Sequence, residues 1–146
     1  MITKELYSDF VDFQKELDEK VNSLTKIAVH AFPEQFCRKR KLISGWYIEE
    51  IEYGIEDYDK YDKNKILAKI SEYTGYGGCE NYSFEITLDE LLLTDEKYLQ
   101  LQWDKQKEYL AEISKKEKVV KKKTQKEKDA KEKATYLKLK EKFEKT

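Results

Sequence analysis

Apolar side chains recur between residues 3 and 31 at steps of four and three. They are Leu6, Phe10, Phe13, Leu17, Val21, Leu24, Ile27 and Ala31, with charged residues between them. This spacing places one apolar side chain per turn on a single face, so it predicts an amphipathic helix over residues 3–31. Thr3 can cap the first turn, and Pro33 ends the helix because the residue before a proline is pushed out of the helical region. We interpret His30, near the last turn, as a structural residue.

The next apolar segment predicts a β-strand with one irregularity. The segment LISGWYIEEIEY predicts a strand over residues 42–53, but its apolar residues Trp46, Ile48, Ile51 and Tyr53 do not share one face under strict alternation. A bulge or an early turn near Glu49 and Glu50 is therefore expected. The polar segment 54–65 that follows is predicted to be a solvated connection. Its acids do not match a calcium loop, because the required glycine and glutamate cannot be placed.

Two further segments alternate clearly enough to predict an antiparallel hairpin. Residues 66–73 and 81–88 each carry an apolar face, and the glycines at positions 75, 77 and 78 lie between them. Glycine permits positive φ, so residues 74–80 are expected to form a wide, exposed loop. Because this loop leads into a strand, it is a poor phosphate cradle, which needs a helix N-terminus.

The last third of the chain is predicted to be helical. Thr87 with Glu90 is typical of a capping box that opens a short leucine helix, and Thr94 can cap a second helix. From Asp95 to about Lys145 there is no glycine or proline, which permits one helix of about 50 residues. Its first part carries a helix–helix contact pattern made of Leu99, Trp103, Leu110 and Ile113.

The end of this helix has a different composition. Residues 121–133 contain Ala130 as their only apolar side chain, so this stretch cannot bury a face and is either a charge-paired, solvent-exposed helix or frayed coil. Apolar residues then return at Tyr136, Leu137, Leu139 and Phe143. An apolar cluster beyond a solvated spacer suggests docking onto the body of the protein, onto another copy or onto a partner.

Together these patterns predict an α+β protein. It has an N-terminal amphipathic helix, a small antiparallel sheet of about three strands and a long charged C-terminal helix. We expect an acidic body over residues 1–94 and a helix over 95–146 that is solvated and lysine-rich from about residue 115. No apolar stretch reaches the length of a membrane helix, and the N-terminus lacks the order of a signal peptide, so a soluble cytoplasmic protein without membrane contact is expected.

Charge is distributed unevenly along the 146 residues. The formal net charge is −1, but residues 1–114 hold 15 basic and 24 acidic side chains, whereas residues 115–146 hold 14 lysines and 6 acids. A basic tail can attract a polyanion or an acidic protein face, and it can equally fold back on its own body or on a neighbouring copy. Arg38 and Arg40 are the only arginines, so the lysine tail favours nonspecific attraction at most.

Residues suited to catalysis or metal binding are scarce in the sequence. Cys37 and Cys79 form no CxxC pair, and His30 is the single histidine. Acids at Glu49, Glu50 and Glu52, or at Asp57 and Asp59, could hold a divalent ion, but the Glu-x-Lys of a nuclease-like site does not follow them. No catalytic residue, metal ligand or cofactor is assigned, and the protein is not expected to be an enzyme.

Binding functions are the better match, and three stay open. Aromatic residues make up 13% of the chain and include 11 tyrosines, which favours a protein-binding module. Its contact residues would be Trp46, Tyr47, Tyr73, Tyr76 and Tyr82. One alternative is nucleic-acid or nucleotide binding, in which loop tyrosines and the lysine tail act with the basic run Arg38, Lys39, Arg40 and Lys41. The other is a structural coiled-coil component that forms homo-oligomers through the C-terminal helix.

Three motifs carry a resemblance to a known class of proteins. They are the step Gly45-Trp46-Tyr47, the segment GGCENYSFEITLDELL at 77–92 and the helix end YLKLKEKFE at 136–144. In these motifs the chain resembles small proteins of tailed bacteriophages, over roughly residues 44–146 and without the first helix. The resemblance implies a phage or prophage source and action in a bacterial cytoplasm. It favours a host protein as partner, and the chain would then inhibit a host nuclease, a polymerase or an antiviral defence complex.

Overall fold

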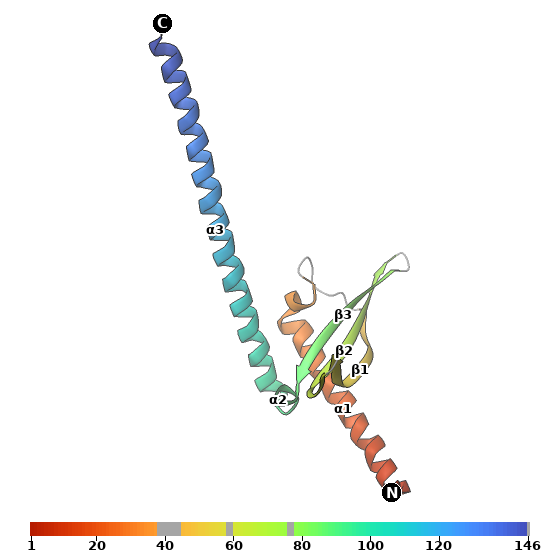
Figure 1. Ribbon diagram of the computed structural model, residues 1–146. Helices are drawn as coiled ribbons and strands as arrows, with labels where there is room; N and C mark the ends of the chain where they lie inside the picture. Colours follow the sequence, from red (N-terminus) through yellow and green to blue (C-terminus); the bar gives the residue numbers. More distant parts are fainter. Residues whose placement is uncertain (38–44, 58–59, 76–77, 146) are drawn as a thin grey trace. The chain divides into compact units, whose positions relative to one another are not determined.

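The structure is a computed structural model that describes residues 1–37, 45–57, 60–75 and 78–145. Its elements are α1 (Lys4–Ala31), the 3₁₀ helix η1 (Pro33–Gln35), β1 (Trp46–Asp57), β2 (Lys60–Gly75), β3 (Gly78–Thr87), α2 (Leu88–Leu91) and α3 (Asp95–Glu144) (Figure 1). This is an α+β fold, as the sequence predicts. The chain divides into two compact units, Met1–Gln106 and Lys107–Thr146, so the first turns of α3 belong with the sheet.

Helix α1 begins and ends where its capping residues predict. The Thr3 hydroxyl accepts a hydrogen bond from the Leu6 amide at 3.0 Å, which satisfies one of the free amides of the first turn. The helix ends at Ala31, and Pro33 opens η1 two residues later. His30 is exposed in the last turn.

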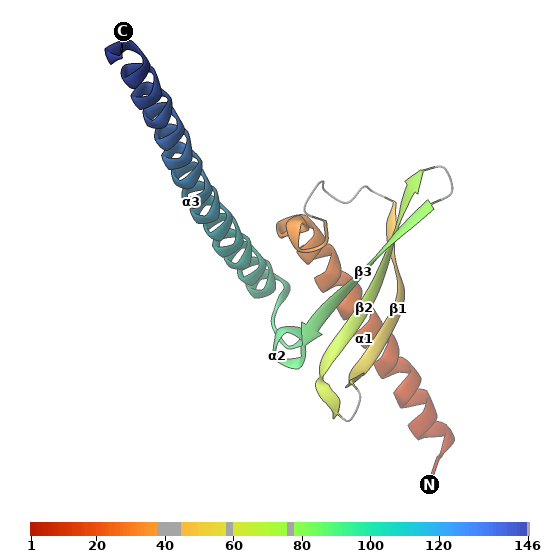
Figure 2. The same ribbon diagram turned by 45° about the horizontal axis from the view of Figure 1, so that its top comes forward.

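The three strands form one antiparallel sheet in the order β1-β2-β3, and α1 lies across one of its faces (Figure 2). The pairing of β1 with β2 shifts register between Ile48 and Glu50, which confirms the bulge expected near Glu49. Because the bulge adds one residue, the side chains before and after it reach the same face. The covered face of β1 therefore carries all four apolar residues that strict alternation would divide between two faces: Trp46, Ile48, Ile51 and Tyr53.

Two predicted loops are strands at their described residues, while residues 58–59 and 76–77 of these loops lie outside the described part of the chain. Segment 54–65 was expected to be a solvated connection, but pairing of β1 with β2 continues from Ile55 opposite Asp62 to Asp57 opposite Lys60. The physical reason is Gly54, whose φ of 82° accommodates a second register shift and lets the ladder resume.

The prediction of a wide loop over 74–80 is also wrong at its described residues, because β2 and β3 stay paired as far as Gly75 opposite Gly78. Backbone pairing needs no apolar side chains, so a polar, glycine-rich segment can still extend a hairpin.

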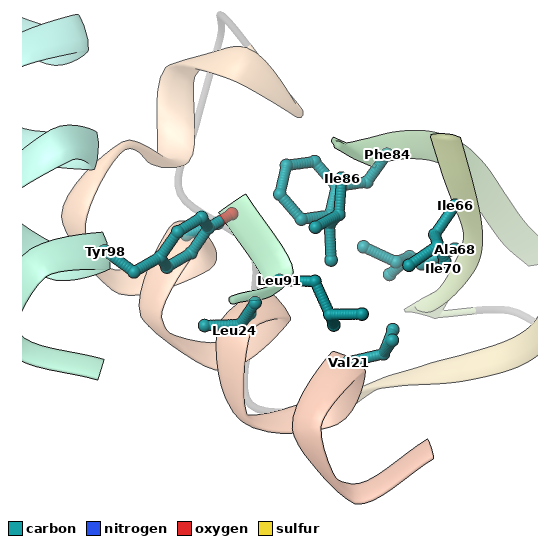
Figure 3. Close-up of a cluster of buried hydrophobic side chains, with 10 residues drawn as sticks. Val21, Leu24, Ile66, Ala68, Ile70, Phe84, Ile86, Leu91 and Tyr98 are labelled. Carbon is teal, nitrogen blue, oxygen red and sulfur yellow. The ribbon is translucent and has the colours of Figure 1, made fainter. Parts of the chain in front are cut away.

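One buried cluster joins the helices to the covered face of the sheet (Figure 3). Helix α1 contributes Val21, Leu24 and Ala28, all with no exposed surface. The other members come from the strands, α2 and α3, and are Ile66, Ala68, Ile70, Phe84, Ile86, Leu91 and Tyr98. Burial of these side chains is what holds α1 against the sheet.

Short capping contacts lead the chain from the sheet into α3. The Thr87 hydroxyl accepts from the Glu90 amide at 3.2 Å, and the Thr94 hydroxyl accepts from the Lys97 amide at 3.3 Å, which confirms both predicted helix starts. Helix α3 is one continuous element of 50 residues, a length that the absence of glycine and proline permits but does not require. The three leucines after Glu90 differ, since Leu91 is buried whereas Leu92 is 75% exposed.

The side of α3 that enters the core is not the predicted contact pattern. Tyr98 and Gln102 are buried, one helical turn apart. Of the predicted contact residues, Leu99 and Ile113 are half-buried, and Trp103 and Leu110 are 44% and 48% exposed. Pairing of α3 with another helix through these four residues stays a prediction.

Candidate protein-binding surface

The face of the sheet opposite α1 carries two tyrosines whose rings are in contact. Tyr47 lies opposite Ser71, and Tyr73 is two residues further along β2, so both side chains emerge on this open face. Their ring centroids are 5.7 Å apart at an interplanar angle of 38°. Tyr47 is 41% exposed and Tyr73 is 61% exposed. Desolvation raises the pKa of Tyr47, and Tyr73 raises it further, so this hydroxyl keeps its proton at neutral pH.

Charged side chains lie beside the tyrosine pair on the open face. The Lys69 ammonium is 2.9 Å from the Glu52 carboxylate and 3.2 Å from that of Glu50. These two hydrogen bonds raise the pKa of Lys69. All three side chains are substantially exposed, so water screens the pairs and they contribute little to stability. The open face therefore joins an aromatic patch to a polar surround, the composition typical of protein interfaces.

A groove of about 830 Å³ runs between α1 and β1. It is lined from α1 by Gln14, Asp18, Asn22 and Lys26, and from β1 by Trp46, Tyr47, Ile48, Glu49, Glu50, Ile51 and Tyr53. Consecutive residues of β1 line it, as expected for a groove along the edge of a strand. Since β1 is an edge of the described sheet, this is the side on which it does not pair with β2.

One hydrogen bond joins the two walls of the groove, β1 and α1. The Tyr53 hydroxyl donates to the Asp18 carboxylate at 2.5 Å. Burial and this carboxylate raise the pKa of Tyr53, so its phenol stays protonated and donates the hydrogen bond. Asp18, Glu49 and Glu50 outnumber Lys26 along the groove, which makes its lining acidic.

The other predicted contact residues are distributed between two locations. Trp46 and Tyr82 lie on the covered face and pack partly against the core. The Tyr82 hydroxyl donates to the Glu80 carboxylate at 2.6 Å, and burial together with that bond raises the pKa of Tyr82. Tyr76 and the basic run Arg38, Lys39, Arg40 and Lys41 lie outside the described residues. Of the predicted set, the structure thus brings together Tyr47 and Tyr73, with Trp46 at the adjoining groove.

Sequence reasoning missed the α1 side of the groove. Gln14, Asp18, Asn22 and Lys26 recur at steps of four, a spacing that places them on one side of a helix. A polar stripe is the expected solvent side of any amphipathic helix, so the spacing alone could not distinguish a groove wall from free surface.

Metal-ligating side chains do not gather in the part of the chain that the structure describes. There, no three histidine, cysteine, aspartate or glutamate residues are placed to hold an ion. Cys37 and Cys79, both among the described residues, are not joined in a disulfide. Over the same residues, no helix has the length and apolar character needed to cross a membrane.

Comparison with protein-family models, with curated proteins and with solved structures found no match. The geometry of this chain is therefore the basis for its proposed function.

Proposed function

We propose that this chain is a non-enzymatic protein-binding module whose contact surface is the Tyr47–Tyr73 pair with the adjoining groove along β1. The observation that carries the proposal is the exposure of two contacting tyrosines on a sheet face that no described element covers. Tyrosine is favoured in interfaces because it buries a large area while losing few rotamers. Contact between the two rings restricts them before binding, which lowers the entropy lost on association.

The groove indicates which form the partner's contacting segment takes. An edge strand offers unpaired backbone donors and acceptors, and an extended segment can add to it as a further strand. The bulge at Glu49 interrupts the regular spacing of these groups, so only a short segment would pair on either side of it. Because the groove lining is acidic, the inserted segment would carry lysine or arginine.

The source of the partner rests on the resemblance to tailed-phage proteins. Under that resemblance the partner is a bacterial host protein in the cytoplasm, and a nuclease, a polymerase or a defence complex would be inhibited by occupation of its surface. Proteins that handle nucleic acid present basic channels, and an acidic body is complementary to such a channel. Residues 1–114 hold 24 acidic and 15 basic side chains, which supplies that charge.

A pull-down from bacterial lysate with the full tagged chain tests the proposal. Wild type is compared with Tyr47→Ala/Tyr73→Ala, with and without nuclease treatment. We expect a stoichiometric protein that survives nuclease and binds the double variant at least tenfold more weakly. Loss of two contact tyrosines commonly costs this much, since a single interface anchor contributes about 2 kcal/mol or more.

Tyr61→Ala is the matched control, because Tyr61 is a 54% exposed tyrosine of the same hairpin that lies away from the pair. It should leave capture unchanged. A protein captured equally by wild type and by the double variant would remove the tyrosine pair from the interface. Recovery of nucleic acid alone would favour the alternative in which the lysine tail binds a polyanion.

A further inference from the structure

The N-terminal half of α1 exposes an apolar face. Leu6, Phe10 and Phe13 are 56%, 58% and 58% exposed, whereas Val21 and Leu24 on the same face have no exposed surface. Figures 1 and 2 show the reason, since the first turns of α1 continue beyond the strands that cover its second half. Two phenylalanines and a leucine on one exposed stripe are typical of a binding surface rather than of solvated helix.

The end of α3 exposes a stripe with matching spacing. Tyr136, Leu139 and Phe143 follow each other at steps of three and four and are 63%, 49% and 74% exposed. Leu6, Phe10, Phe13 and Leu17 are spaced by four, three and four. Both spacings are those of the a and d positions of a coiled coil, in which two helices bury their stripes against each other.

The charges that flank the two stripes are opposite. Beside the α1 stripe, Asp9 and Glu16 occupy the positions that border an a/d seam, and both are exposed. Beside the α3 stripe, the bordering positions hold Lys133, Lys140 and Lys142. Two α1 stripes together would place acids against acids, and two α3 stripes would place lysines against lysines. Only the mixed pair brings opposite charges together.

We propose that the exposed stripe of α1 is a docking site for a second copy of this chain, whose α3 binds there through residues 133–145. The second copy is the occupant because each chain carries both halves of the contact. Apolar burial supplies the attraction, and the flanking charges select the mixed pairing over the two like pairings. This contact is separate from the tyrosine pair and the β1 groove, so the host-binding proposal does not depend on it.

The test uses the full chain and two charge-reversal variants. One variant is Asp9→Lys/Glu16→Lys, and the other is Lys140→Glu/Lys142→Glu. Sedimentation equilibrium over a hundredfold range of protein concentration measures the mass at low and at high salt. We expect wild type to exceed the 17.5 kDa of one chain as concentration rises, and to bind itself more weakly at high salt. Each variant alone should self-associate at least tenfold more weakly.

Mixing the two variants provides the decisive measurement. In the mixture, the basic α1 of one variant faces the acidic α3 of the other, and the two unaltered stripes also face each other with opposite charges. Association should therefore return to the wild-type level. Glu5→Lys/Asp12→Lys and Lys122→Glu/Lys123→Glu are the controls, because they make the same charge changes outside the bordering positions and should leave self-association unchanged.

Three results would overturn the proposal. A wild-type mass of one chain at every concentration would mean that the stripes do not join copies, as would be the case if both were satisfied within one chain. Undiminished association of either variant alone would indicate pairing of two like stripes. A mixture that stays monomeric would show that the charges act by another route, and circular dichroism of each variant confirms that the helices are intact.

Discussion

The Tyr98 side chain enters the core from the first turns of α3 (Figure 3). It has no exposed surface, and its hydroxyl has no hydrogen-bond partner among the described residues. The ring gains free energy by leaving water, whereas the buried hydroxyl loses its hydration without replacement. Tyr98 therefore anchors α3 through its ring and not through its polar atom.

Removal of the Tyr98 hydroxyl and removal of its ring should change stability in opposite directions. We expect Tyr98→Phe to keep the packing and to raise the free energy of unfolding by about 1 kcal/mol, the cost of an unsatisfied buried donor. Tyr98→Ala would leave a cavity and lower the free energy of unfolding by about 3–5 kcal/mol. Urea denaturation followed by circular dichroism measures both. A destabilised phenylalanine variant would mean that the hydroxyl is bonded in solution.

Burial of Tyr98 also predicts a loss of stability in alkaline solution. Burial raises the pKa of this phenol, and the Glu90 carboxylate raises it further. Above pH 10 the unfolded chain loses the phenolic proton while the folded chain retains it, so the unfolded state binds fewer protons and stability falls as pH rises. The stabilisation is complete below pH 10.

The expected slope for Tyr98 alone is about 1.4 kcal/mol per pH unit above pH 10. Urea midpoints at pH 8, 10 and 11 measure it, and Tyr98→Phe should reduce the decline. Tyr136→Phe is the control for the substitution itself, because Tyr136 is 63% exposed. Equal alkaline declines in wild type and Tyr98→Phe would contradict the assignment.

At the scale of the elements, β1 depends on one extra residue. Without a bulge, Trp46 and Ile48 would share a face with Glu50 and Glu52. The register shift at Glu49 instead aligns Trp46 and Ile48 with Ile51 and Tyr53, which pack against the core. The same shift places Tyr47 on the open face beside Tyr73. The bulge thus sets both the packing of β1 and the candidate binding surface.

Deletion of Glu49 should therefore be tolerated far better than deletion of Glu52, a regularly paired residue of β1. Removal of Glu49 joins Ile48 to Glu50, and strict alternation then keeps Ile48 and Ile51 on the covered face and Tyr47 on the open face. Removal of Glu52 makes Ile51 and Tyr53 neighbours, which puts them on opposite faces of the strand. We expect the Glu52 deletion to lower the free energy of unfolding by about 3 kcal/mol or more, because one of these partly buried side chains loses its site, and the Glu49 deletion to lower it by about 1 kcal/mol.

Thermal unfolding compares the two deletions, and partner capture by the Glu49 deletion reports whether Tyr47 keeps its place on the open face. A Glu49 deletion as destabilising as the Glu52 deletion would contradict the assignment of Glu49 as the extra residue of the bulge.

Periodicity predicts the elements of this fold better than it predicts their ends. The steps of α1, the alternation of β3 and the caps at Thr3, Thr87 and Thr94 are local features, and the structure confirms them. The conflict among the apolar residues of β1 even predicts the bulge. The predictions of loops over 54–65 and 74–80 were wrong at the described residues. Pairing there depends on the partner strand, whose position is not encoded in the local pattern.

The candidate surface was predictable only in part for the same reason. The contact residues predicted from the sequence include Tyr47 and Tyr73 beside Trp46, Tyr76 and Tyr82, but the contact between Tyr47 and Tyr73 results from the register of β1 against β2. Likewise the groove exists because α1 crosses the sheet beside β1, and no sequence spacing records that crossing.

At the scale of the whole molecule, the buried residues and the basic charge belong to different parts of the chain. Every described residue of the buried cluster precedes Gln106, the end of the first compact unit. Residues 115–146 hold 14 lysines and 6 acids, and the described residues among them are exposed. A solvated helix of this composition is available for binding without weakening the core.

A chain shortened to residues 1–114 should accordingly fold with unchanged intrinsic stability. We expect its urea midpoint to equal that of the full chain at protein concentrations where the full chain is monomeric. At higher concentrations the full chain should become the more stable of the two, because binding between folded copies shifts the unfolding equilibrium by mass action. High salt should reduce this difference, since it screens the flanking charges. A lower midpoint for the shortened chain at every concentration would instead mean that the tail stabilises its own body.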